Sequence, residues 1–233
     1  MKKPSEIAVA VGTGAGTTAL VYHAEQPAHA ALILGHGAGA GQHSAFMVAF
    51  STALSQLGLD IVTFNFLYTE QQRRLPDRAP LLEACYRAVI DVSRAQLASA
   101  RRALFIGGKS MGGRMATHVA AADAALPVAG LVLLGYPLHP PGQPQKLRDA
   151  HLPSVRRPML FVQGSRDTFG TPEELAPVLA RMAPPPTLHV IAGGDHSFKV
   201  GGSKKDPGRQ AAVDAGIQRT IAAWIAAITA GGT

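Results

Sequence analysis

Residues 103–112, Ala-Leu-Phe-Ile-Gly-Gly-Lys-Ser-Met-Gly, decide the fold of this chain. The apolar start of this stretch predicts a strand, and the apolar pattern over residues 111–122 predicts a helix directly after it. A serine between the two, in the pattern G-x-S-x-G, requires a turn so tight that the backbone of Ser110 is strained. Only small residues fit two positions before and after it, which accounts for Gly108 and Gly112. The sequence therefore predicts a serine hydroxyl raised above the end of a strand.

A serine hydroxyl is a weak nucleophile at neutral pH, so it needs a base, and the base needs an orienting carboxylate. Asp167 follows a strand predicted at residues 159–163, and His196 follows a strand predicted at residues 188–191. The carboxyl ends of parallel strands meet at one edge of a sheet, where ligands bind. The chain order Ser, Asp, His is that of hydrolases with a nucleophile elbow. We therefore predict that Ser110, Asp167 and His196 form a catalytic triad.

The anion that forms on a substrate carbonyl needs two backbone N–H donors, an oxyanion hole. We expect Met111, directly after the serine, to provide one. The second is expected from the loop after the strand at residues 31–34, which reads Gly-His-Gly-Ala-Gly-Ala. We assign it to Ala38, with Gly37 or Gly39 as near alternatives, because small residues let the backbone approach the substrate closely.

Three further residues have weaker claims to a chemical role. Asp195 adjoins His196, but a neighbour in sequence points the wrong way to orient that imidazole, so we expect Asp195 to hold the loop. Cys85 falls on the apolar face of a predicted helix and is expected to be inert. His118 lies a turn or more into the helix after the serine and is expected to be structural.

Basic residues surround the predicted site, among them Arg78, Arg114, Lys146 and Arg148. The residues that we expect to contact substrate are His36, Gly37, Lys109, Arg73, Arg74, Tyr136 and His139. This charge leads to the hypothesis of a small ester or thioester that carries an anionic group. The alternative is that the basic side chains pair with Asp77, Asp149 and one another to fix the loops. His36 has a second interpretation, as a brace for the oxyanion loop.

Strand patterns alternate with helical patterns along the chain, which favours a mostly parallel sheet with helices on both faces. The predicted strands are residues 6–11, 18–23, 31–34, 60–66, 103–106, 131–134, 159–163 and 188–191, the first two being edge strands. The predicted helices are residues 44–57, 81–97, 111–122, 172–182 and 210–228, with a polar loop at 68–80. We expect the first two helices to face the core with Phe46, Phe50, Ala53 or Leu54, Leu57, Leu81, Cys85, Val89 and Val92. This order predicts an α/β-hydrolase fold in one domain, residues 1–233, without a cap domain.

The composition indicates which kinds of partner are not expected. The chain has 233 residues, 47% of them hydrophobic, yet no apolar run reaches the ~18 residues that cross a bilayer. The net charge of +7 comes from scattered basic residues, and their largest group, residues 199–209, has the composition of an exposed loop. One Trp and four Tyr offer little surface for stacking on bases. We expect neither nucleic acid nor a membrane as partner.

Cysteine content and motifs indicate compartment and cofactors. A single cysteine excludes an internal disulfide and favours a reducing compartment. The segment after Met1-Lys2-Lys3 is interrupted by Pro4 and glycines, so we expect no signal peptide and a cytoplasmic protein. No nucleotide-binding glycine motif and no zinc-like spacing occurs, so neither a cofactor nor a metal is expected. The expected partner is a small-molecule ester, and a homodimer is left open.

Four segments carry a family resemblance: residues 108–115 (GKSMGGRM), 134–142 (LGYPLHPPG), 163–170 (QGSRDTFG) and 194–198 (GDHSF). The chain resembles the small α/β-hydrolases of the dienelactone-hydrolase-like group, specifically the KANL/Tex-type hydrolase-like domains. The resemblance covers nearly the whole chain and implies the fold and the triad of Ser110, Asp167 and His196. Dienelactone hydrolase proper has a cysteine nucleophile where this chain has Ser110, so lactone specificity is not carried over.

These features predict a serine hydrolase that cleaves short-chain carboxylic esters through an acyl-enzyme, because a site without a cap is expected to be shallow. A thioesterase and a small peptidase stay open, since the same triad would serve each reaction. The resemblance also leaves open a non-catalytic interaction module, since some relatives act as scaffold subunits.

Overall fold

The computed structural model describes residues 3–201 and 206–231. Within them one sheet has eight strands: β1 (Ser5–Val11), β2 (Ala15–Tyr22), β3 (Ala30–Gly35), β4 (Leu59–Phe64), β5 (Leu104–Lys109), β6 (Gly130–Leu134), β7 (Met159–Gly164) and β8 (Thr187–Ile191). Their order is β1-β2-β4-β3-β5-β6-β7-β8. β2 is antiparallel to both of its neighbours, and the strands from β4 to β8 are parallel. The mostly parallel sheet that the sequence predicts is confirmed.

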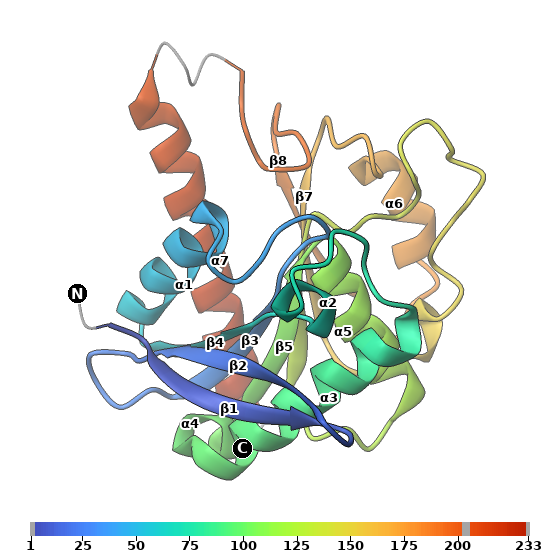
Figure 1. Cartoon of the computed structure of the whole chain (residues 1–233). Helices are drawn as coiled ribbons and strands as arrows, with labels where there is room; N and C mark the ends of the chain where they lie inside the picture. Colours follow the sequence, from blue (N-terminus) through green and yellow to red (C-terminus); the bar gives the residue numbers. More distant parts are fainter. Residues whose placement is uncertain (1–2, 202–205, 232–233) are drawn as a thin grey trace.

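Helices cover both faces of the sheet (Figure 1). α1 (Ala45–Gln56) and α7 (Pro207–Gly231) lie on one face, and α3 (Ala79–Gln96), α5 (Met111–Ala122) and α6 (Pro172–Leu179) lie on the other. Successive side chains of a strand point to opposite faces, so a sheet covered on both sides needs strands that are apolar throughout. Accordingly Leu32 and Ile61 pack in the layer of α1 and α7, while Ile33 and Val62 pack in the layer of α3 and α5. This is the α/β-hydrolase fold, and no cap domain interrupts it among the described residues.

Shorter elements complete the fold. α2 (Leu67–Glu70) follows β4, α4 (Ala98–Arg102) precedes β5, and a single 3-10 turn, η1 (Leu152–Ser154), interrupts the proline-rich loop after β6. None of the helices in the described part of the chain combines the length and the hydropathy needed to cross a membrane.

Some local predictions were wrong. β2 is not an edge strand, because β4 pairs along its second side. The region predicted as a polar loop contains most of α2 and the start of α3, and its Tyr68 is buried. Leu57 and Leu81 were expected in the core but are 40% and 41% exposed. Their helices instead bury neighbouring positions, such as Met47 in α1 and Leu82 in α3, because the apolar stripe of each helix is rotated from the predicted one.

Two predictions fall partly outside the described residues. Residues 202–205 of the predicted basic loop are not described, and Arg209 at the end of that stretch lies in α7. Residues 1–2, from the segment considered as a signal peptide, are not described either.

The order in which the chain adds strands to the sheet reverses at β3. β3 leads through α1 to β4 on one side, and β4 then leads through α3 to β5 on the other side of β3. Because the two connections pass over opposite faces, the loops after β3 and β5 separate and leave a crevice at the carboxyl ends of these strands. The predicted oxyanion loop follows β3 and Ser110 follows β5, so both lie at this crevice.

Tyr86 of α3 fixes the distance between helix and sheet next to this crevice. It is fully buried, and its hydroxyl accepts a hydrogen bond from the Gly107 N–H (2.9 Å). The carbonyl oxygens of Gly107 and Ile33 lie 2.5 Å and 3.1 Å from the same hydroxyl as acceptors. The phenol therefore ties α3 to β3 and β5 at once.

We expect Tyr86→Phe to lower the free energy of unfolding by about 1–3 kcal/mol, because buried backbone groups lose their partner. Urea denaturation followed by circular dichroism measures this difference. Tyr22→Phe is the matched control, since the Tyr22 hydroxyl makes no hydrogen bond among the described contacts and its loss is expected to cost less. Equal effects of the two substitutions would contradict the role given to Tyr86.

Candidate active site

Ser110 lies on a strained turn between β5 and α5. Its backbone has φ 51° and ψ −113°, in a region that residues other than glycine seldom adopt. The turn is held because the Ser110 N–H donates to the Leu134 carbonyl (2.9 Å). A Cβ atom at Gly108 or at Gly112 would clash with the backbone carbonyl of Gly35. The prediction that only the smallest residue fits these two positions is confirmed.

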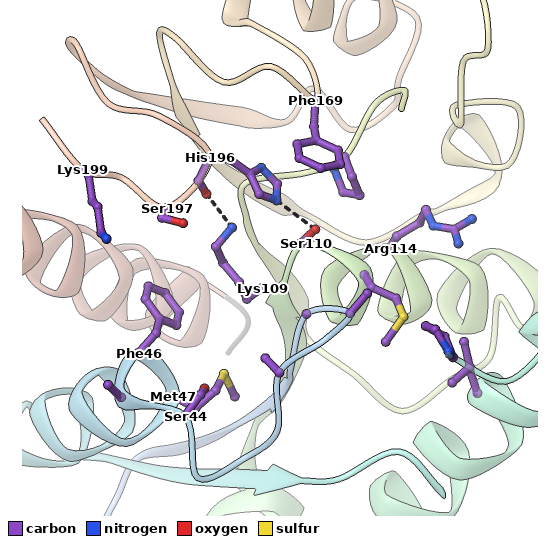
Figure 2. Close-up of a pocket in the computed structure, with 18 of the residues that line it drawn as sticks. Ser44, Phe46, Met47, Lys109, Ser110, Arg114, Phe169, His196, Ser197 and Lys199 are labelled. Atoms are coloured by element: carbon purple, nitrogen blue, oxygen red, sulfur yellow. Dashed lines mark hydrogen bonds between the residues drawn. The ribbon is translucent and has the colours of Figure 1, made fainter. Parts of the chain in front are cut away.

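Three loops bring Ser110, His196 and Asp167 together, and Figure 2 shows the imidazole of His196 directed at Ser110. The Ser110 Oγ lies 2.9 Å from Nε2 of His196. Nδ1 of the same imidazole lies 2.8 Å and 3.0 Å from the two carboxylate oxygens of Asp167. With Nδ1 protonated toward the carboxylate, Nε2 is left to accept the proton of the serine hydroxyl. The geometry thus links the three residues of the predicted triad by hydrogen bonds.

Gln163, the residue before the end of β7, supports the carboxylate and was not predicted from the sequence. Its buried amide donates from Nε2 to Asp167 Oδ2 (2.9 Å) and to the Gly170 carbonyl (2.7 Å). Its Oε1 accepts the N–H of Tyr136 (2.8 Å). The signal was present in the sequence, since a glutamine ends an otherwise apolar strand whose side chains are all buried. A buried amide in such a place needs partners of its own, and one of them is Asp167.

The loop that carries His196 is held by its own acid. Asp195 Oδ1 accepts the N–H groups of Ser197 (2.8 Å) and Lys199 (2.9 Å), as expected for a residue that holds the loop. The ring of Phe169 packs over the imidazole of His196, with ring centroids 4.2 Å apart. These contacts limit the movement of the loop and of the imidazole.

The loop after β3 lies against the serine. A Cβ at Gly37 would lie 3.6 Å from Cβ of Ser110, so this backbone approaches the nucleophile closely. His36 braces the loop, since its Nδ1 donates to the Gly37 carbonyl (2.8 Å) and its Nε2 accepts the Phe66 N–H (3.1 Å). Burial lowers the pKa of His36, which keeps the ring in the neutral form that these two bonds require. Ala38 and Met111 both line the cavity described next.

A cavity of about 800 Å³ opens at Ser110 and His196. On one side lie Phe46 and Met47 of α1, and on the opposite side of Ser110 lies Arg114 of α5 (Figure 2). Arg148 and Phe169 line the cavity as well. Cavities of about 300–1,000 Å³ bind ligands of drug size. Residues of the loops after β3, β4 and β6 line this cavity, and the described residues contain no cap domain. The shallow site expected from the sequence stays a prediction.

A comparison with known protein families identifies the domain. Residues 28–226 match the family model of the alpha/beta hydrolase domain. The chain belongs to this family. Since the match spans most of the chain, every strand from β3 to β8 is part of the hydrolase domain.

Solved structures share the fold of this α/β-hydrolase. A dienelactone hydrolase from Anabaena variabilis is 21% identical, with a TM-score of 0.71 over 94% of this chain and 97% of its own. A serine hydrolase homologue from Coxiella burnetii is 18% identical, with a TM-score of 0.72 over 94% of this chain and 98% of its own. A serine hydrolase without a lid from Xanthomonas campestris is 21% identical, with a TM-score of 0.67 over 94% and 95% of the two chains. At these identities the likeness establishes the fold.

The structure separates the predicted substrate-binding residues of this α/β-hydrolase into two groups. Gly37 and Lys109 line the cavity. The other five do not line it, for two physical reasons. Three of them are buried in contacts with the protein itself, namely His36, Tyr136 and His139. Two lie in an exposed part of the loop before α3, where Arg73 pairs with Asp77 and Arg74 is exposed to solvent.

Cys85 and His118, the other residues considered for a chemical role, lie outside the cavity lining. Cys85 is fully buried in α3, and burial raises the pKa of its thiol to about 12, so the reactive thiolate does not form at neutral pH. His118 lies 3.2 Å from the carboxylate of Glu83, outside the cavity lining. Within the described residues, no group of three or more His, Cys, Asp or Glu side chains is arranged to hold a metal ion.

We expect Gln163→Leu to lower the free energy of unfolding by about 1–3 kcal/mol for each buried polar group left without a partner. Asp167 loses one of its two protein donors besides His196, while the Phe169 N–H (2.8 Å) is retained. Chemical denaturation measures the stability. Gln42→Leu is the control, since Gln42 is equally buried but bonds to the Thr18 carbonyl (3.1 Å) far from Asp167. A loss of stability for Gln42→Leu only would contradict this account.

Proposed function

We propose that this chain is a serine hydrolase that cleaves carboxylic esters, short-chain esters among them, through an acyl-enzyme. The observation that carries the proposal is the hydrogen-bonded series from Ser110 through His196 to Asp167, which opens into a cavity of about 800 Å³. The strained backbone of Ser110 supports it, because such strain persists where function requires it. Membership of the alpha/beta hydrolase family is consistent with a hydrolase.

In the proposed mechanism, Ser110 Oγ attacks the carbonyl carbon while His196 Nε2 takes its proton. The N–H groups of Met111 and Ala38 stabilise the oxyanion that forms. When the tetrahedral intermediate collapses, the bond to the alcohol oxygen breaks and His196 returns the proton to that oxygen. Water then attacks the acyl-enzyme by the same route and releases the acid. Asp167 orients the imidazole and stabilises its protonated form.

The N-terminal end of α5 supports the assignment of Met111. It is the first residue of the helix, so its N–H has no acceptor within the helix and points out of its end. The positive end of the helix dipole adds to the stabilisation of negative charge at this place. Ala38 is favoured by the approach of its loop to Ser110, and Gly37 and Gly39 stay as alternatives for the second donor.

Labelling with a fluorophosphonate probe tests the proposal. We expect the native chain to be labelled and Ser110→Ala to show no label, because the probe reacts only with an activated serine. We expect Asp167→Asn to lower kcat for p-nitrophenyl acetate by about 10⁴-fold, since the imidazole then has the wrong tautomer. A native chain that is neither labelled nor active on p-nitrophenyl esters of graded length would favour the interaction module. Parallel assays with thioesters and peptides separate the other two reactions.

Two arginines support a substrate that carries an anionic group. Arg114 and Arg148 line the cavity, and neither side chain has a hydrogen bond or ion pair to the protein among the described residues. Burial lowers the pKa of Arg114, and the nearby Arg148 guanidinium lowers it further. Two neighbouring cations repel each other, and a carboxylate between them would relieve this repulsion. The carboxylate of Glu83 acts against this pKa shift and lies 3.2 Å from the ring of His118.

The alternative, that the basic residues pair with acids to fix the loops, describes other members of the set. Arg73 pairs with Asp77, as this alternative expects. Asp149 pairs with Arg181, a residue outside the set considered in the sequence. Arg114 is one helical turn from Ser110, about 6 Å along the axis of α5. A substrate carboxylate is therefore proposed at a short distance from the scissile carbonyl, on the side of Ser110 away from Phe46.

Paired substrates test this preference. Two anionic esters are used, the p-nitrophenyl monoester of adipic acid and 4-acetoxybenzoate, each paired with the neutral carboxamide of the same shape. We expect one of the two anionic esters to be cleaved with a higher kcat/KM than its own carboxamide. The first pair has its charge on the acyl part and the second on the alcohol part. Arg114→Gln is expected to lower kcat/KM for the favoured carboxylate by about ten- to a hundredfold, because charge-assisted hydrogen bonds are lost. The carboxamide is expected to be cleaved as before.

Lys146→Gln is the matched control, because it removes the same charge from an exposed side chain of the loop that carries Arg148. Equal rates for both members of each pair in the native chain would refute the anionic substrate and leave the ester hydrolase itself untouched.

A further inference from the structure

Lys109 was expected to contact substrate, but its ammonium is engaged by the protein. Lys109 is the last residue of β5 and directly precedes Ser110. Its Nζ donates to the backbone carbonyl of His196 at 2.5 Å. Among the described contacts, no other donor reaches this carbonyl. Lys109 and Ser110 are adjacent in the chain and both contact His196 (Figure 2). Lys109 contacts its main-chain carbonyl, and Ser110 contacts its imidazole.

The surroundings of the ammonium favour this contact over one with substrate. Nζ lies 5.4 Å from the ring centroid of Phe198, at a distance where an aromatic face attracts a cation. Burial lowers the pKa of Lys109 to about 8, while the carboxylates of Asp167 and Asp195 act against this shift. Hydrogen bonds from a charged donor are stronger where water is excluded. The contact between Nζ and the carbonyl is therefore a firm one.

The space around Nζ is also limited by the loop after β6. A Cβ at Gly135 would lie 2.9 Å from Nζ and 3.1 Å from the His196 carbonyl oxygen. Gly135 has φ 63°, a conformation that favours glycine. The contact between Lys109 and His196 thus occupies a gap that exists because residue 135 has no side chain.

The other main-chain hydrogen bonds of the His196 loop, among the described residues, run within the loop, to the segment after β7 and to Gln210 of α7. Asp195 bonds to N–H groups of the same loop, and the Gly194 carbonyl accepts the N–H of Arg166 after β7 (2.8 Å). These bonds shape the loop and attach it to β7. Within the part of the chain that the structure describes, the Lys109 contact alone attaches the main chain of His196 to β5, the strand that precedes the serine.

We propose that Lys109 is a positioning residue, whose ammonium holds the main chain at His196 so that the imidazole stays within hydrogen-bond distance of Ser110 and Asp167. This inference rests on the proposed hydrolase function, since the imidazole is the base of that reaction. Lys109 acts through His196 and does not touch the reacting atoms. Its removal is expected to slow the chemical step more than it weakens substrate binding, because catalysis depends on the placement of the base to within about 1 Å.

Lys109→Met keeps most of the volume of the side chain and removes its donor. We expect kcat for neutral p-nitrophenyl esters to fall by about ten- to a hundredfold with little change in KM. We also expect the low-field proton resonance of the His196 Nδ1–H to broaden or disappear, because the imidazole then leaves Asp167 part of the time. Lys146→Met, which removes an exposed lysine outside the cavity, is the control for loss of charge.

Chemical rescue separates positioning from general damage to the structure. Lys109→Cys treated with 2-bromoethylamine regains an ammonium at the length of lysine, whereas 1-bromopropane gives a neutral chain of the same size. Cys85, the one native cysteine, is fully buried and is expected to stay unmodified. We expect the amine to restore kcat and the resonance, and the propyl chain to restore neither.

Unchanged kcat and an unchanged resonance in Lys109→Met, or equal recovery with both reagents, would overturn the proposal. If Lys109→Met does not fold, the comparison of the two alkylated forms of Lys109→Cys decides instead. The resonance reports the bond from His196 to Asp167 whether or not an ester is cleaved. A chain without esterase activity whose resonance still depends on Lys109 would therefore refute the proposed function and support the positioning role.

Discussion

The close approach of β3, β5 and α5 at three glycines is the constraint on which the site depends. Gly108 and Gly112 both lie against the backbone carbonyl of Gly35, with no room for a side chain at either position. This packing allows Ser110 to adopt a positive φ and to raise its hydroxyl above the sheet. It also places the loop after β3 beside the serine, as the proposed oxyanion hole requires. A methyl group at one of these positions would separate the nucleophile from its surroundings.

The polar groups around Ser110 depend on one another in turn. Gln163 holds Asp167, Asp167 orients His196, and the imidazole reaches the serine hydroxyl. Ser110 follows β5, Gln163 and Asp167 lie at the end of β7 and just after it, and His196 follows β8, so the parallel sheet sets their separation. In such a network every buried donor and acceptor needs its partner, and the loss of one leaves others unsatisfied. The site is therefore as much a property of the supporting amide as of the reacting groups.

Charge is distributed unevenly around the cavity. Lys109 is directed to the main chain of His196, while Arg114 and Arg148 line the cavity and have no ion pair among the described residues. The basic loop residue Arg73 pairs with an acid and lies outside the lining. The net charge of +7 therefore says little about the substrate. The proposed anionic substrate depends instead on the position of two guanidinium groups.

The sequence by itself determined the strand order along the chain, the elbow, and the three residues that meet at the strand ends. These signals are local, since an apolar run followed by Gly-x-Ser, by Asp or by His reads the same in any context. Tertiary structure decided which face α1 and α3 bury, that β2 is an interior strand, and that His36 braces a loop. It also decided where the long side chains end. Lys109 reaches a carbonyl 87 positions away in the chain, and the direction of a flexible side chain depends on such distant partners, which no local pattern encodes.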